Sequence, residues 1–189
     1  MQNKNLRKLN ILDRYGDTTP LILADMKRYN NRIKIKEESI AEHSFFVAYN
    51  IIKIGYDYGI AQSIINKAVT MAIVHDVSES YTNDIPHDCK HAYPELRELL
   101  SKIEGAYIKS ITPEIEYYYN EVEQGDTLEA LLVSLGDAIS VLEFTNRELE
   151  LGNKSEDFQI IHNEICVRIT TLFEKLDTIM KATKKEENK

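Results

Sequence analysis

The sequence predicts an all-α protein, with one domain of six or seven helices over residues 1–182 and a charged, disordered tail at 183–189. Three observations support this prediction. The chain of 189 residues contains only seven glycines and four prolines, and few of its segments alternate apolar and polar residues as strands do. Its apolar residues, 43% of the total, recur instead at helical spacing. They are numerous enough for the core of one domain.

The first two predicted helices begin at recognisable caps. Residues 17–20 (DTTP) combine a cap residue with a proline in the first turn, and this helix is expected to run to about Arg28. In the second helix, Ser39 and Glu42 match a capping box ahead of an apolar run. That helix is expected to end near Gly59, where the apolar run stops.

The other predicted helices follow from apolar periodicity and from the turn signals between them. A third helix, at about 61–76, carries His75 on the same face as three apolar residues. Residues 82–92 (TNDIPHDCKHA) are polar and rich in turn formers, which predicts a loop. Four further helices are predicted by the same criteria, at about 94–110, 113–124, 126–151 and 156–182.

Composition excludes several classes of protein. A net charge of -8 argues against DNA or RNA binding, because a polyanion repels an acidic chain whose bases are not concentrated in one place. No apolar stretch approaches the roughly 20 residues of a membrane span, and the first ten residues lack the apolar core of a signal peptide. Cys89 and Cys166 are far apart, which favours a reducing compartment. We therefore expect a cytoplasmic protein that binds neither nucleic acid nor membrane.

Asp137 is the most informative position of the 126–151 helix. At 100° per residue, this helix is apolar on two opposite faces, which predicts that it lies in the centre of the protein. Asp137 falls within one of these faces and is the only ionisable residue between Glu129 and Glu143. A buried lone carboxylate is costly, so a compensating partner is expected. A metal ion, an Arg or Lys side chain, or a helix N-terminus would each serve.

Two histidines point toward the core from other helices. His43 lies on an apolar face of the second predicted helix, and His75, followed by Asp76, lies on that of the third. A His-Asp pair alone is weak evidence, because His87-Asp88 repeats it in a polar segment and a core histidine needs no function. Inward histidines and carboxylates from three helices, however, form a ligand set for Mn²⁺, Co²⁺, Fe²⁺ or Zn²⁺.

These residues resemble the H…HD…D signature of the HD-domain phosphohydrolases. The surrounding residues are similar to the bacterial 5'-deoxynucleotidase branch and to its HD-domain-containing protein 2-like relatives. Arg28-Tyr29 stands about fifteen residues before the first histidine, and residues 38–44 read ESIAEHS. Residues 75–86 (HDVSESYTNDIP) match the pattern H-D-x-S-E-x-x-x-x-D-x-P. The resemblance spans about residues 20–150, and this compound motif is specific.

The resemblance implies an HD-domain helical bundle around one buried divalent transition metal, with Mg²⁺ also possible. Four residues match the family's ligands: His43, His75, Asp76 and Asp137. Arg28 would bind the phosphate, since a guanidinium group matches phosphate geometry. Tyr29 and Lys90 would be further substrate contacts, although a solvated role for Lys90 is the plainer interpretation.

Glu79 and Asp84 match the family's acid–base carboxylates, placed around the attacking water and the leaving oxygen. The implied activity is removal of the 5'-phosphate from (deoxy)nucleoside 5'-monophosphates by a homodimeric enzyme with a small nucleotide substrate. One alternative is a deoxynucleoside triphosphate triphosphohydrolase, against which the sparse Lys and Arg near the motifs argue. Another is a non-catalytic metal- or nucleotide-binding regulatory module, which would not need Glu79 and Asp84.

The chain departs from the bacterial deoxynucleotidases at one position. Tyr29 stands where those enzymes carry a tryptophan, whose indole is thought to crowd the 2' position of the sugar. Tyrosine is smaller and carries a hydroxyl group. We therefore expect weaker discrimination against ribonucleotides than the family pattern implies.

Overall fold

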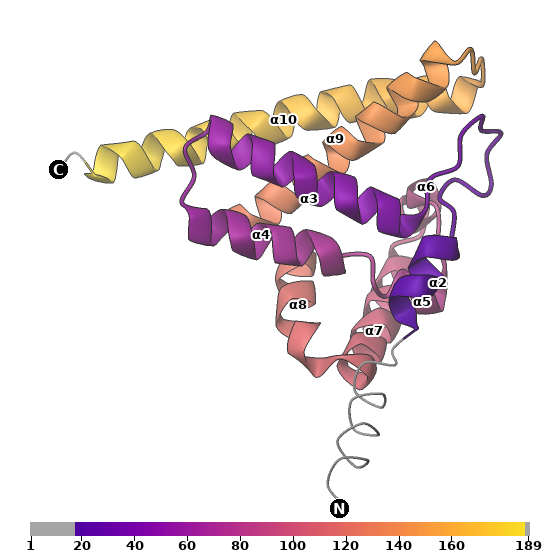
Figure 1. The fold of residues 1–189 in the computed structure, drawn as a ribbon, viewed down its shortest axis with the longest axis horizontal. Coiled ribbons are helices and arrows are strands. Elements are labelled where there is room, and N and C mark those ends of the chain that lie inside the picture. The colour runs from indigo at the N-terminus through magenta and orange to yellow at the C-terminus, as the bar shows by residue number, and fades with distance from the viewer. Residues whose placement is uncertain (1–17, 188–189) are drawn as a thin grey trace, which may run out of the picture.

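The structure, a computed structural model, describes residues 18–187 and is all-α over that range (Figure 1). Its helices of seven residues or more are α2 (Thr19–Asp25), α3 (Ile40–Asp57), α4 (Gln62–Val74), α7 (Pro94–Ile111), α8 (Glu116–Gln124), α9 (Leu128–Glu150) and α10 (Glu156–Glu187). Three shorter elements are α5 (Glu79–Thr82), α6 (His87–Ala92) and the 3-10 turn η1 (Pro113–Ile115). This confirms the predicted all-α class. Within the described range, no helix combines the length and apolar character needed to cross a bilayer.

Helix α9 lies at the centre of the bundle, as its two apolar faces predicted. It packs against α3, α4 and α10, and Figure 1 shows it running behind α3 and beneath α10. Leu132, Leu135 and Ala138 of α9 are completely buried. Val47 and Ile51 of α3 join Leu132 and Leu135 in the same core cluster. The core therefore holds α9 in place from several sides, and the candidate ligand Asp137 with it.

The predicted capping box is present at the start of α3, where Ser39 and Glu42 exchange side-chain and backbone hydrogen bonds. Helix α2 is shorter than predicted: it ends at Asp25, and Met26 is extended. The reason is a tertiary contact, because the backbone N–H of Arg28 donates to the carbonyl of Glu38 at 2.9 Å. Arg28 therefore lies on an extended segment beside the start of α3, not on a helix.

Two other segments differ from the predictions. The loop expected over residues 82–92 is wrong in its second half, where α6 begins directly after Pro86. Proline is a favourable residue at a helix start, and the backbone N–H groups of Cys89 and Lys90 donate to its carbonyl. Helix α10 continues to Glu187, past the expected end at 182. Residues 183–187 (TKKEE) contain no glycine or proline to stop it.

Gly136 allows α3 and α9 to approach closely beside Asp137. A Cβ atom there would meet the carbonyl oxygen of Val47 at 2.7 Å. Because that atom belongs to the backbone, the helices would have to separate. We expect Gly136→Ala to lower the free energy of unfolding by about 1–3 kcal/mol in denaturant titrations.

Gly105 of α7 is the matched control, because a Cβ atom there meets nothing within 4 Å. Gly105→Ala is expected to raise stability by about 0.5–1 kcal/mol, since alanine favours the helix more than glycine does. Equal stability of Gly136→Ala and the wild-type protein would contradict the close-approach argument.

Candidate active site

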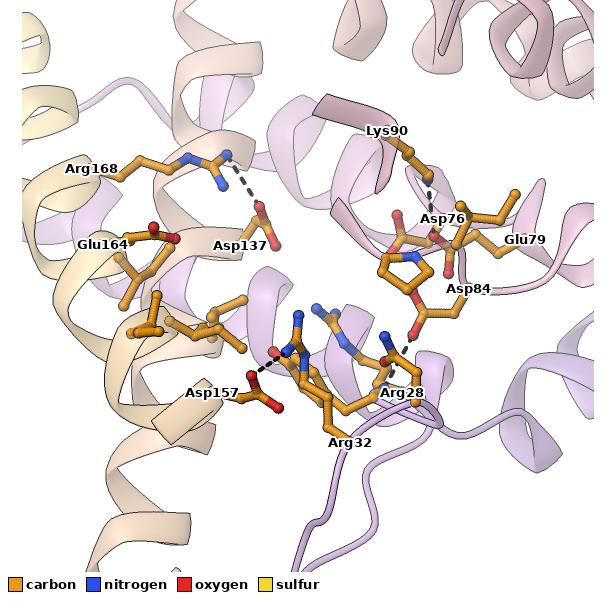
Figure 2. Close-up of a pocket in the computed structure, with 18 of the residues that line it drawn as sticks. Arg28, Arg32, Asp76, Glu79, Asp84, Lys90, Asp137, Asp157, Glu164 and Arg168 are labelled. Carbon is orange, nitrogen blue, oxygen red and sulfur yellow. Dashed lines mark hydrogen bonds and ion pairs between the residues drawn. The ribbon is translucent and has the colours of Figure 1, made fainter. Parts of the chain in front are cut away.

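A cavity of about 500 Å³ opens between α9, α10, the short helices α5 and α6, and the segment after α2 (Figure 2). It brings together nearly all the residues that the sequence singled out. The predicted site residues that line it are Arg28, Tyr29, His75, Asp76, Glu79, Asp84, Lys90 and Asp137. His43 lies behind this surface and is 1% exposed.

Three of the predicted ligands form a candidate metal centre. His43, His75 and Asp137 each offer a ligand atom, and these atoms lie within 4.8 Å of one another. The Nε2 atom of His43 is 3.3 Å from Oδ1 of Asp137 and 3.7 Å from Oδ2 of Asp76. The Nε2 atom of His75 is 3.2 Å from the same Asp76 oxygen. Asp76 therefore adjoins both histidines.

The hydrogen bonds of the two histidines favour a cation between them. Nδ1 of His75 lies 2.7 Å from the carbonyl oxygen of Ala72, which can only accept, so this nitrogen carries the proton. Nδ1 of His43 lies 3.0 Å from the hydroxyl of Ser140. Both Nε2 atoms are buried and lack a hydrogen-bond partner in the described structure. Buried imidazole nitrogens that face carboxylates and lack a hydrogen-bond partner are the donor set of a divalent transition metal.

The charge states of His43 and Asp137 suit that assignment. Burial, and then the charge of Arg28, lower the pKa of His43 to about 4. Burial also acts on His75, but the Asp76 carboxylate outweighs it and raises the pKa of His75 to about 9, so a metal would have to displace the proton from Nε2 of this histidine. Burial opposes ionisation of Asp137, yet His43 and then Arg168 hold its pKa well below the usual range. Asp137 is thus ionised and His43 neutral, as metal ligands must be.

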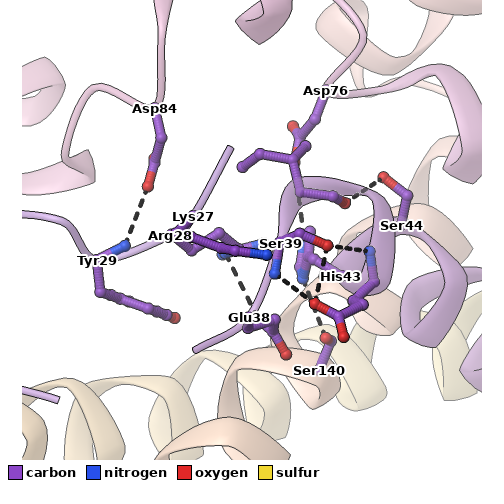
Figure 3. A network of polar contacts seen from close by, with 12 residues as sticks. Lys27, Arg28, Tyr29, Glu38, Ser39, His43, Ser44, Asp76, Asp84 and Ser140 are labelled. Carbon is purple, nitrogen blue, oxygen red and sulfur yellow. Dashed lines mark hydrogen bonds and ion pairs between the residues drawn. The ribbon is translucent and has the colours of Figure 1, made fainter. Parts of the chain in front are cut away.

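Arg28 reaches the same cavity with an unsatisfied donor. Its Nε lies 3.7 Å from Oε2 of Glu38, which is itself buried (Figure 3). Its Nη1 atom is buried and has no hydrogen-bond partner in the described structure. A buried guanidinium N–H without a partner is costly unless something else accepts its hydrogen bond. An anionic substrate oxygen would satisfy it.

Tyr29 is held in place from two sides. Its φ angle of 56° lies in the left-handed region, which a non-glycine residue adopts only when the surroundings stabilise it. Its N–H donates to Oδ2 of Asp84 at 3.2 Å. Its ring stacks on Phe144 with centroids 4.9 Å apart and meets the edge of Phe158 at 5.6 Å. The Arg28–Tyr29 backbone is therefore fixed before any substrate binds.

Glu79 and Lys90 face each other at the pocket, with 3.8 Å between Lys90 Nζ and Glu79 Oε1. The purely solvated interpretation of Lys90 does not fit this position. Burial, and then the charges of Asp76 and Asp84, raise the pKa of Glu79 to about 9, so Glu79 holds a proton until a bound cation offsets those charges. A carboxylate in such surroundings is a stronger base than free glutamate.

The sequence patterns did not indicate the contribution of α10 or of the segment after Tyr29. Arg168 of α10 lies 3.3 Å from Oδ2 of Asp137, and Arg32 lies 3.2 Å from Oδ1 of Asp157. The sequence contained one usable signal. Positions 157, 161, 164 and 168 are spaced so that they share one helical face, which mixes charged residues with isoleucine.

Glu148 of α9 was also missed, although it is completely buried. Its carboxylate accepts the backbone N–H groups of Ile35 at 2.8 Å and Lys36 at 2.7 Å, and the amide of Asn153. It therefore fixes the far end of the segment that carries Arg28 and Tyr29. Its only signal in the sequence was an acidic residue at a helix position that the apolar periodicity places inside the protein.

Solved structures share this fold. An HD-domain phosphohydrolase from Listeria innocua matches with a TM-score of 0.69 and 26% identity, over 83% of this chain and 79% of that chain. The structure of a cyanophage S-2L HD phosphohydrolase, bound to dA and one catalytic Zn²⁺ ion, matches with a TM-score of 0.62 over 87% of this chain and 95% of that chain. At 22% identity, the second match bears on the fold alone. The fold and the site thus define an HD-domain phosphohydrolase.

The chain belongs to the 5'-deoxynucleotidase YfbR-like family, whose sequence model matches residues 21–182. The 5'-deoxynucleotidase PM0747 of Pasteurella multocida is 27% identical over 139 residues, which are 68% of this chain and 71% of that protein. A dATP triphosphohydrolase of cyanophage S-2L is 37% identical over 78 residues, 41% of each chain. These matches confirm the predicted resemblance. They show that the chain is a 5'-deoxynucleotidase-like HD phosphohydrolase.

Proposed function

We propose that this protein removes the 5'-phosphate from (deoxy)nucleoside 5'-monophosphates, with one divalent transition metal bound per chain. One observation carries the proposal. The unpaired guanidinium nitrogen of Arg28 and the bare Nε2 atoms of His43 and His75 belong to one site. The first suits a phosphate oxygen and the other two suit a cation, so the site offers complementary groups for a metal and a phosphate.

His43, His75, Asp76 and Asp137 would hold the metal. When bound, such a cation polarises a phosphoryl oxygen and lowers the pKa of a water molecule. Arg28 binds the phosphate and orients it, because Glu38 and the fixed Tyr29 backbone leave the guanidinium little freedom. Lys90 supplies a second positive charge in the pocket, beside Glu79.

Glu79 and Asp84 perform the proton transfers in this proposal. Glu79 adjoins Asp76 and accepts a proton from the water that attacks phosphorus. Asp84 adjoins the Arg28–Tyr29 segment and supports the departing 5' oxygen. The bond between phosphorus and that oxygen breaks, and the oxygen takes up, through Asp84, the proton that Glu79 received from the water. The products are a nucleoside and inorganic phosphate.

A panel of nucleoside 5'-monophosphates and triphosphates, incubated with Mn²⁺ or Co²⁺, tests this function directly. The expected result is release of inorganic phosphate from deoxynucleoside monophosphates, with the nucleoside as the other product by chromatography. A chelator should abolish the release. Full activity in chelator would exclude the metal site from the reaction, and inactivity on every nucleotide would refute the proposal.

A triphosphohydrolase is the second candidate, and the structure removes one argument against it. Basic residues near the motifs are sparse in sequence, yet four basic residues from different parts of the chain line the pocket: Arg28, Arg32, Lys90 and Arg168. Six acidic residues line it as well: Asp76, Glu79, Asp84, Asp137, Asp157 and Glu164. Because a triphosphate carries more negative charge than a monophosphate, this excess of acidic residues disfavours it more strongly. The same panel separates the two candidates by product, since the alternative releases triphosphate.

Tyr29 is the candidate determinant of sugar preference. Its ring lines the pocket, and a tryptophan there would fill more of the space near the sugar. We expect Tyr29→Trp to raise the ratio of kcat/KM for dAMP over AMP, and for dCMP over CMP. The gain from excluding one hydroxyl group is on the order of 1–3 kcal/mol. A wild-type enzyme that already rejects ribonucleotides by many thousandfold would assign the preference to another residue.

We also propose that the protein forms a homodimer through the exposed face of α3. Four apolar or aromatic side chains on this face are 38% exposed or more: Phe45, Tyr49, Ile52 and Tyr56. Their spacings of four, three and four residues are the same when read in reverse. Two antiparallel copies of α3 would therefore place Phe45 against Tyr56 and Tyr49 against Ile52, as a two-fold interface requires.

Sedimentation of the wild-type protein and of Tyr49→Lys tests this face. The wild-type protein should sediment as a dimer and Tyr49→Lys as a monomer, because a charge in the middle of an apolar contact is costly. Tyr93→Lys is the control, since Tyr93 is also exposed but lies on another surface. A monomeric wild-type protein would refute the proposal.

A further inference from the structure

The pocket has a second wall that the proposed phosphate chemistry does not use. This wall belongs to α10 and lies across the cavity from the segment that carries Asp76, Glu79 and Asp84 (Figure 2). Its apolar part consists of Ile160, Ile161, Ile165 and the neighbouring Val141 of α9. Ile160 is 47% exposed although it lines the cavity. Apolar surface on the wall of an open cavity suits the flat face of an aromatic ring.

Glu164 stands among these isoleucines and differs from the other acidic residues of the pocket. Each of the others has a partner: Asp76 with His75, Glu79 with Lys90, Asp84 with the N–H of Tyr29, Asp137 with Arg168, and Asp157 with Arg32. The carboxylate of Glu164 has no hydrogen bond or ion pair with any residue in the range 18–187. It is therefore available to a ligand in the cavity.

We propose that Glu164 recognises the base of the nucleotide and favours bases with an amino group on the ring edge. This inference rests on the proposed function only in placing a nucleotide in the pocket. A carboxylate accepts hydrogen bonds and cannot donate, so it pairs with the exocyclic amine of cytosine, adenine or guanine. In uracil and thymine, a carbonyl oxygen replaces the cytosine amine and repels the carboxylate. With the ring against the isoleucines, Glu164 meets the edge of the base.

The nucleotides dCMP and dUMP provide a matched test, because they share ring size, sugar and phosphate and differ only at this ring position and at the adjacent N3, which carries a hydrogen in uracil. The wild-type enzyme is expected to favour dCMP by about tenfold or more in kcat/KM, as the loss of a charged hydrogen bond predicts. In Glu164→Gln the ratio should approach one, since an amide donates to the uracil carbonyl as well as accepting from the amine. Glu174→Gln, an exposed change further along α10 and outside this cavity, should keep the wild-type ratio.

Binding of the nucleosides deoxycytidine and deoxyuridine, measured by calorimetry on the same proteins, separates this inference from the proposed reaction. Stronger binding of deoxycytidine that disappears in Glu164→Gln supports the base site even if no nucleotide is hydrolysed, in which case only the reaction is wrong. Hydrolysis of dCMP and dUMP at equal rates by the wild-type enzyme overturns the base site and leaves the reaction intact. Equal binding of the two nucleosides, or a ratio unchanged in Glu164→Gln, overturns it as well.

Discussion

Replacing Asp137 with alanine is expected to abolish metal binding and to lower kcat/KM by roughly a thousandfold, since the charge stabilisation that a metal supplies amounts to several kcal/mol. Asp137 is the carboxylate that faces His43, and its replacement leaves two imidazoles and Asp76 to hold a cation. Metal analysis of the purified protein should give about one transition metal per wild-type chain and little in the variant. Added Mn²⁺ should raise the melting temperature of the wild-type protein alone, because only a bound ligand stabilises the fold.

Glu150→Ala is the control for this experiment, because Glu150 is an exposed carboxylate on the same helix. It should keep both metal content and activity. If Asp137→Ala retained both, the partner of the Asp137 carboxylate would be Arg168 alone, which lies 3.3 Å away. The proposal of a metal centre at this site would then be wrong.

Replacing Arg28 with lysine is expected to lower kcat/KM by roughly a hundredfold or more, with little change in stability. Lysine keeps a positive charge beside the buried Glu38 carboxylate but loses the planar pair of donors that fits a phosphate. Alanine is the less informative change. It would leave Glu38 without its partner in a position where burial already raises the pKa of that carboxyl group to about 7.

Stability in denaturant and kcat/KM on the preferred nucleotide are the two measurements for Arg28. Arg97→Lys, an exposed change outside the pocket, should alter neither. The double variant Arg28→Ala/Glu38→Gln removes the guanidinium without leaving Glu38 charged, so its loss of activity reports on the phosphate contact. Near wild-type rates in Arg28→Lys and in the double variant would show that Arg28 does not bind the phosphate.

Much of the fold was predictable because its signals are local. The capping box of Ser39 and Glu42 involves residues three apart, and the two apolar faces of α9 follow from helical periodicity alone. The inward positions of His43 and Asp137 follow from the same periodicity, since a residue on an apolar face points into the core. The compound motif around these residues then identified the family, which the match over residues 21–182 confirms.

The tertiary structure decided what surrounds those residues, because each remaining feature depends on partners far apart in the chain. Arg28 leaves its predicted helix to pair with Glu38, and Tyr29 is held by Asp84, 55 residues away. No local sequence pattern indicates which positively charged group contacts Asp137. Nor does one indicate that α10 lines the pocket with Glu164. Periodicity places a residue on a face of its own helix, but only the packing of α10 along α9 determines which cavity that face lines.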